Sequence, residues 1–86
     1  MNLYNEEGVK LANSEKHDEA ITNFSRAIDG SADGDKRLPA FLANRAHSLI
    51  YCDRLDEAIA DSTRATKADP KCIIAYMGHA KALLYR

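Results

Sequence analysis

The sequence predicts an all-α domain of five helices that pair as antiparallel hairpins. Two stretches are almost alike, DEAITNFSRA from Asp18 to Ala27 and DEAIADSTRA from Asp56 to Ala65, at a shift of 38 residues. Apolar residues elsewhere recur at the three- and four-residue spacing of helices, and no segment shows the strict alternation of a half-buried strand. The breaks between these segments are short, which favours antiparallel neighbours.

The first hairpin is expected from a helix over residues 2–13, a polar break, and a second helix from about residue 18. Asp18 and Glu19 stand at the beginning of the second helix, where the helix dipole favours negative charge. The apolar and small residues of the first helix fall at roughly helical spacing: Leu3, Tyr4, Gly8, Val9, Leu11 and Ala12. Those of the second form one face: Ala20, Ile21, Phe24, Ala27 and Ile28.

A loop is expected over residues 29–37, which hold two glycines and no apolar side chain larger than alanine. The third helix should run from Leu38 to about Tyr51, because Pro39 suits a first helical turn. The fourth should run from Leu55 to about residue 67 and end before Pro70. A fifth helix from about residue 72 carries the remaining apolar positions: Ile73, Tyr76, Ala80, Leu83 and Leu84.

The odd-numbered helices share a pattern of a large apolar residue, a small residue four positions later, and a leucine three positions after that. The small residue should let the partner helix of the hairpin approach closely. The pattern reads Tyr4, Gly8, Leu11 in the first helix, Leu42, Ala46, Leu49 in the third, and Tyr76, Ala80, Leu83 in the fifth.

This arrangement resembles the tetratricopeptide repeat (TPR), a helix hairpin of ~34 residues with small and aromatic residues at set positions and a closing proline. The resemblance implies one domain over residues 1–86, a right-handed α-solenoid of about two and a half units. It divides into a first repeat, 1–38, with the extended loop 29–37, a second repeat, 39–72, and the first helix of a third, 73–86. The second-helix matches are Ala20, Phe24 and Ala27 in the first unit, and Ala58, Ala65 and Pro70 in the second.

The chain departs from the family pattern at several positions. The slot before the small residue is usually leucine, but here it holds Glu7, Arg45 and His79. Ser62 replaces the aromatic residue that corresponds to Phe24, so we expect looser packing between the second and third units.

By resemblance, the chain is a protein–protein interaction module, an adaptor or scaffold. Its first helices would line a concave groove that receives a peptide or helix of a partner protein. The predicted binding residues are Asn5, Val9, Asn44, His47, Tyr51, Ile74, Met77, Lys81 and Tyr85. The wider groove would add Asn2, Ala12, Asn13, Ala40, Ala43, Ile50, Gly78 and Leu84.

The predicted groove becomes apolar toward its C-terminal end, which favours an amphipathic helix or hydrophobic motif as ligand. The alternative is self-association, in which the unpaired fifth helix is capped by another copy or by the rest of a longer protein.

The co-chaperone adaptors of this family hold acidic chaperone tails with lysine, asparagine, asparagine, lysine and arginine. The corresponding residues here are Asn5, Val9, Asn44, Ile74 and Gly78, of which Asn44 alone matches. A buried carboxylate needs several donors or cations. We therefore expect no binding of acidic chaperone tails in the usual way.

Composition argues against other classes of function. The net charge is −1 with the basic and acidic residues interleaved, so neither nucleic acid nor a membrane surface is an expected partner. No apolar run or leader pattern suggests a membrane span or secretion, which predicts a cytoplasmic location. No catalytic motif or cofactor site is recognised, so an enzyme is not expected.

Metal binding and disulfide bonding are also not expected. The polar loop resembles a calcium loop, but Ala40 stands where the final glutamate ligand should be. No two of the three histidines have the spacing of a zinc motif. Cys52 and Cys72 do not make a disulfide framework of the secreted kind.

Overall fold

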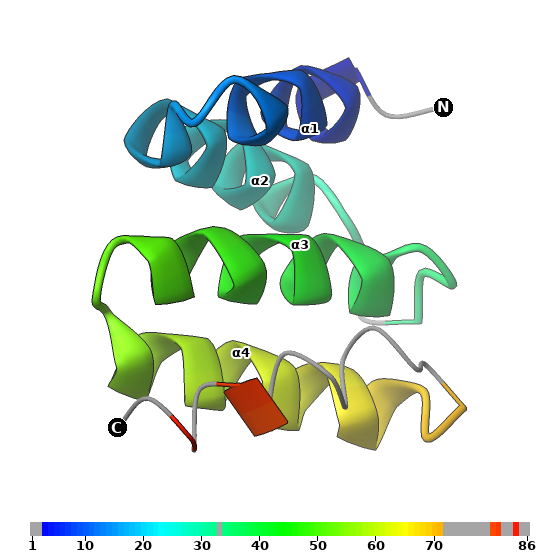
Figure 1. Ribbon diagram of the computed structural model, residues 1–86. Helices are drawn as coiled ribbons and strands as arrows, with labels where there is room; N and C mark the ends of the chain where they lie inside the picture. The colour runs from blue at the N-terminus through cyan, green and yellow to red at the C-terminus, as the bar shows by residue number, and fades with distance from the viewer. Residues whose placement is uncertain (1–2, 33, 72–79, 82–83, 85–86) are drawn as a thin grey trace.

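The computed structural model describes residues 3–32, 34–71, 80, 81 and 84 of the chain. Within them it contains four helices: α1 (Leu3–Asn13), α2 (His17–Asp29), α3 (Leu38–Tyr51) and α4 (Leu55–Ala68). They lie side by side in chain order, each antiparallel to the next (Figure 1). The all-α class and the bounds of the first four predicted helices agree with this arrangement to within about two residues.

The prediction of a five-helix solenoid is wrong in its helix count, because the described part of the chain has four. The expected third unit, 73–86, lies outside the described residues except at Ala80, Lys81 and Leu84. The fifth helix was inferred from apolar spacing and from the repeated pattern of a large, a small and a leucine residue. Short helices need a neighbouring element that buries their apolar face, and the four observed helices each have one.

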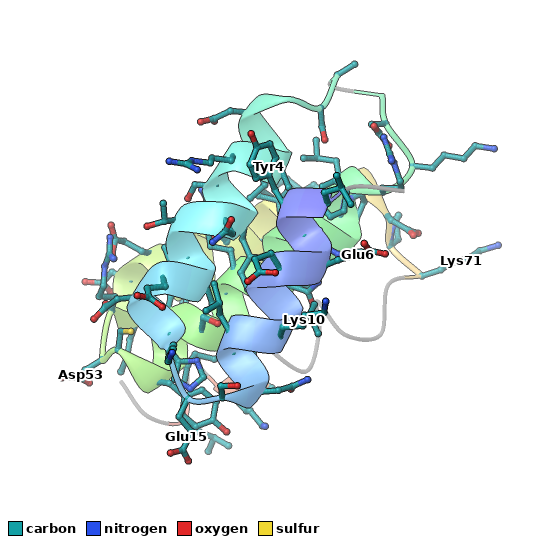
Figure 2. All side chains as sticks on the ribbon, turned by 90° about the horizontal axis from the view of Figure 1, so that it is seen from above. Tyr4, Glu6, Lys10, Glu15, Asp53 and Lys71 are labelled. Carbon is teal, nitrogen blue, oxygen red and sulfur yellow. The ribbon has the colours of Figure 1, made fainter. Side chains whose placement is uncertain are left out.

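The two hairpin turns have the same backbone geometry at a shift of 38 residues. Glu15 and Asp53 both adopt the left-handed conformation, with φ of 64° and 59°. The next residue in each turn donates its backbone N–H back to a leucine: Lys16 to Leu11 over 2.8 Å, and Arg54 to Leu49 over 2.9 Å. This is the six-residue hydrogen bond of a Schellman helix end. Figure 2 shows Glu15 and Asp53 at the same end of the molecule.

Proline positions the ends of α3 and α4 as expected. Pro39 lies in the first turn of α3, where no helical N–H is needed. Asp69 has extended backbone angles, φ −143° and ψ 95°, directly before Pro70, and α4 ends there. The loop before α3 is held by Asp35, whose carboxylate accepts hydrogen bonds from the backbone and guanidinium of Arg37.

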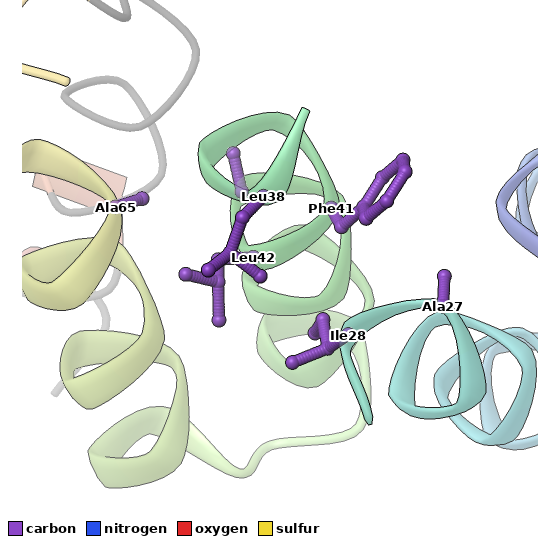
Figure 3. Close-up of a cluster of buried hydrophobic side chains, with 7 residues drawn as sticks. Ala27, Ile28, Leu38, Phe41, Leu42 and Ala65 are labelled. Carbon is purple, nitrogen blue, oxygen red and sulfur yellow. The ribbon is translucent and has the colours of Figure 1, made fainter. Parts of the chain in front are cut away.

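The core lies around α2 and α3, the two middle helices: α2 packs against α1 and α3, and α3 packs against α2 and α4. Figure 3 shows Leu42 of α3 directed toward Ala65 of α4, and Phe41 directed to the other side of α3. One cluster of buried residues joins α2, α3 and α4: Ala27, Ile28, Leu38, Phe41, Leu42, Ala43 and Ala65. A second joins the same helices nearer the hairpin turn: Ile21, Ala46, Leu49 and Ala58.

The small residue in the first helix has the predicted role. Gly8 is the buried residue of α1, and a Cβ atom on it would lie 2.5 Å from Cε1 of Phe24 in α2. Phe24 is itself 1% exposed, so its ring has little space to move away. Glycine at position 8 therefore allows α1 and α2 to approach closely.

Equivalent positions are buried to different degrees in the two hairpins. Tyr4 is 48% exposed although it matches Leu42, which is fully buried. Leu42 lies between two helices, whereas α1 is packed against α2 and only lightly against α3. Tyr4 is therefore only partly covered, unlike its counterpart Leu42.

Candidate functional site

Two expected groove positions, Asn5 of α1 and Asn44 of α3, meet directly. The Nδ2 group of Asn44 donates a hydrogen bond of 3.1 Å to Oδ1 of Asn5, which joins the two helices directly. Val9 follows Asn5 by one helical turn and is 38% exposed. We call the surface formed by Asn5, Val9, Asn44, His47 and Tyr51 the α1–α3 face.

Two members of the α1–α3 face lie at the C-terminal end of α3, one turn apart. The rings of His47 and Tyr51 are 5.1 Å apart and meet edge to face. Tyr51 is 62% exposed, although its ring also stacks on that of His17, with centroids 4.5 Å apart and planes 3° apart. His17 belongs to the first turn of α2, so this cluster joins the second and third helices.

A pocket of about 240 Å³ opens beside this ring cluster. Its described lining residues are His47, Ile50, Tyr51 and Lys81, and we call it the ring pocket. Lys81 thus lies beside two other predicted site residues, His47 and Tyr51. Ile74, Met77 and Tyr85 lie outside the described residues.

The electrostatic environment of the ring pocket is positive. Burial lowers the pKa of His47, and the nearby positive charge of Lys81 and the imidazole of His17 lower it further. His17 also has its Nδ1 atom 3.4 Å from the hydroxyl oxygen of the buried Ser48, a contact that helps hold its ring in place. An anion that enters this pocket would meet the ammonium group of Lys81 and the imidazole of His47.

Ala43 does not belong to the groove, which corrects one of the wider groove predictions. It is 1% exposed and part of the core cluster around Leu42. Ala40, three residues earlier, is exposed. The helical face that carries Asn44 and His47 is therefore narrower than the resemblance implied, since Ala43 points between helices rather than outward.

His17 is the residue of this site that sequence reasoning missed. It was placed in a polar break between helices, and it is instead the first residue of α2. The repeat itself held a usable signal, because a shift of 38 residues aligns His17 with the partly buried Leu55. A ring at this position should pack against the hairpin rather than extend into solvent.

A second hollow of about 240 Å³ lies over α2, α3 and α4, but its charges are already paired. Arg45 donates from Nε and Nη2 to the two carboxylate oxygens of Asp61, over 2.6 and 2.8 Å, and from Nη1 to Ser25 over 3.1 Å. Arg54 pairs with Glu57 on its rim. This hollow offers a ligand little unsatisfied hydrogen-bonding capacity, so the ring pocket is the better candidate.

Cys52 lies at the end of α3, close to the ring cluster. Its Sγ atom is 3.5 Å from Oδ1 of Asp18, and burial together with this carboxylate raises the pKa of the thiol. A raised pKa keeps the thiol protonated and lowers its nucleophilicity.

No protein-family model, curated protein or solved structure matches this chain. In the residues that the structure describes, no helix is both long and apolar enough to cross a bilayer.

Proposed function

We propose that this chain is a TPR-like interaction module that binds a peptide or amphipathic helix of a partner protein along the α1–α3 face. The hydrogen bond between Asn5 and Asn44 carries the proposal, because it links the first helices of successive hairpins, α1 and α3, into one continuous surface. An adaptor or scaffold in the cytoplasm is the role that follows from the resemblance.

The chemistry of the α1–α3 face suits an extended or helical peptide. Asparagine side chains present both donor and acceptor groups, which can bind backbone amides without selecting for charge. Val9 and Tyr51 add exposed apolar area at 38% and 62% exposure. A mixed surface of this kind can bind the apolar side of a helix and satisfy polar atoms at its margin.

Acidic chaperone tails remain unexpected ligands. Among the clamp positions that the structure describes, Asn5 and Val9 carry no charge, and Asn44 shares its amide with Asn5. The positive charge of this surface, that of Lys81, lies in the ring pocket instead.

The proposal is tested by selecting peptides from a random display library against the whole chain and measuring their affinities by fluorescence anisotropy. Val9→Glu combined with Tyr51→Ala should weaken binding of the selected peptides by about tenfold or more, because it removes two apolar contacts. Thr22→Glu combined with Arg64→Ala changes exposed residues of α2 and α4 and serves as the matched control. Circular dichroism should be the same for all three proteins.

Peptides that bind the parent and the Val9→Glu, Tyr51→Ala variant equally would contradict the proposal. They would show that the chain binds through another surface.

Self-association is the second candidate, and exposed apolar residues near the two ends of the chain favour it. Leu3 is 76% exposed and Leu84 is 80% exposed. Contact between such residues of two copies would remove apolar surface from water.

A further inference from the structure

The ring pocket combines apolar surface with the positive charge of Lys81. Ile50 and the ring of Tyr51 supply the apolar part of its lining, while His47 and Lys81 supply nitrogen atoms. Lys81 forms no ion pair or hydrogen bond with any other residue in the described part of the chain. None of the described lining residues is acidic.

The contrast with the second hollow shows why this charge is available. There, the guanidinium groups of Arg45 and Arg54 are matched by Asp61 and Glu57. In the ring pocket, the charged or titratable groups that act on His47 are Lys81 and, from α2, His17, and both oppose its protonation. An incoming carboxylate would relieve this repulsion and would need no protein carboxylate to be displaced.

The pocket is sized for one side chain rather than for a metabolite. Its volume of about 240 Å³ lies below the roughly 300–1,000 Å³ that is typical of small-molecule sites. A single large apolar side chain can contact Ile50 and Tyr51 there, with room left beside the nitrogen atoms.

We propose that the ring pocket receives an acidic apolar segment of the partner protein. A large apolar side chain of this segment packs against Ile50 and Tyr51, and a carboxylate one helical turn away pairs with Lys81 and His47. This inference rests on the proposed function and adds the chemistry of the partner: an amphipathic helix with an acidic residue beside its apolar anchor.

The minimal probe of this chemistry is 3-phenylpropionate, with the neutral 3-phenylpropanamide as its isostere. Both are titrated into the whole chain, and the resonances of His47, Tyr51 and Lys81 are followed by NMR. The carboxylate should shift these resonances and bind about fivefold more tightly than the amide. Its binding should tighten as the pH falls below about 6.5, because the pKa of His47 lies below that ordinary value and its protonation then adds positive charge.

Lys81→Met keeps the apolar stem of the side chain and removes its charge. It should reduce the preference for carboxylate over amide to about twofold or less, since His47 alone remains. Lys36→Met, in the loop before α3, is the matched control and should leave the preference unchanged.

Equal binding of the two probes to the parent chain would overturn the inference and leave a merely apolar pocket. Shifts that exclude His47, Tyr51 and Lys81 would also overturn it.

The peptides selected in the preceding experiment separate this inference from the proposed function. Suppose that their binding depends on Val9 and Tyr51 but not on Lys81, and that they lack acidic residues. This result would support the proposed function and contradict the inference of an acidic partner segment. If none depends on the α1–α3 face, the proposed function fails, while the probe titration still reports on the pocket.

Discussion

Gly8 shows how one missing Cβ atom sets the distance between two helices. Phe24 contacts the face of α1 where any side chain would collide with its ring. The second hairpin has Ala46 in place of Gly8 and Ser62 in place of Phe24. Ala46 is slightly larger than glycine, and the residue opposite it, Ser62, is much smaller than phenylalanine. Ser62 is fully buried and donates its hydroxyl to Ala58 O over 2.8 Å, which satisfies the group that replaces the aromatic ring.

Gly8→Ala should lower the free energy of unfolding by about 1–2 kcal/mol. The overpacking penalty against Phe24 exceeds the ~1 kcal/mol that alanine gains over glycine within a helix. Urea denaturation of the single variants and of Gly8→Ala with Phe24→Leu measures the coupling. The smaller leucine should recover most of the loss, and an equal loss in both backgrounds would contradict the steric explanation.

Asp61→Ala should lower the free energy of unfolding by about 2–4 kcal/mol, because it leaves the guanidinium of Arg45 without its charge partner. Asp61 is 8% exposed, and the Asp61 carboxylate also raises the pKa of Arg45. Thermal and urea unfolding measure the change. Glu57→Ala is the control on the same helix: its pair with Arg54 is solvent-exposed, so little change is expected. Similar losses in the two variants would contradict a special role for the Arg45–Asp61 pair.

His47 should make the folded chain less stable as the pH falls. The pKa of His47 is lowered in the folded state, so between that pKa and the unfolded value of about 6.5 the unfolded chain binds more protons. This contribution is fully present above about pH 6.5 and is lost as the pH falls below it. Urea midpoints at several pH values should decrease less on acidification for His47→Gln than for the parent. Equal slopes for the two proteins would refute this assignment.

At the scale of elements, the two hairpins are most alike in the backbone geometry of their turns. Both hairpins use a non-glycine residue in the left-handed conformation, followed by a residue that donates back to the leucine of the preceding helix. The left-handed conformation crowds the Cβ atom of an L-amino acid, so these turns keep a strained backbone position that packing on either side maintains.

Glu15→Gly and Asp53→Gly should each raise the free energy of unfolding by about 1 kcal/mol, because glycine has no Cβ atom to crowd in this conformation. Both side chains are exposed, so little packing is lost. Urea denaturation measures the gain. Arg64→Gly, within α4, is the control and should destabilise by up to about 1 kcal/mol. Destabilisation by the turn variants would show that Glu15 or Asp53 makes a compensating interaction.

At the scale of the whole molecule, the helices follow one another as neighbours in chain order, so most tertiary contacts form between elements close in sequence. Among the residues that the structure describes, the larger exposed apolar side chains lie on three parts of the chain: Leu3, Tyr4 and Val9 on α1, Tyr51 on α3, and Leu84. Scattered apolar side chains are ordinary on the surface of a monomer.

The chain should therefore be monomeric in solution, with the α1–α3 face open to a partner. Multi-angle light scattering across a range of protein concentrations measures the mass. Leu84→Glu is a useful comparison, because it should leave a monomer unchanged. A dimer that dissociates on this substitution would favour self-association over binding of another protein.

Sequence by itself determined the positions of the four helices and their turns. The determinants are local: proline at residues 39 and 70, glycine and polar residues in the loop, and apolar residues at helical spacing. The 38-residue shift also identified Gly8 as a close-approach position, because a small residue recurs at that place in each unit.

Only the tertiary structure decided which side chains meet across elements. The stack of His17 on Tyr51, the pair of Arg45 with Asp61 and the exposure of Tyr4 each depend on how two or more helices pack. Helical periodicity specifies a face but neither the partner opposite it nor whether a partner is there. For this reason the helices could be located from local patterns, while the ring pocket and its positive charge could not.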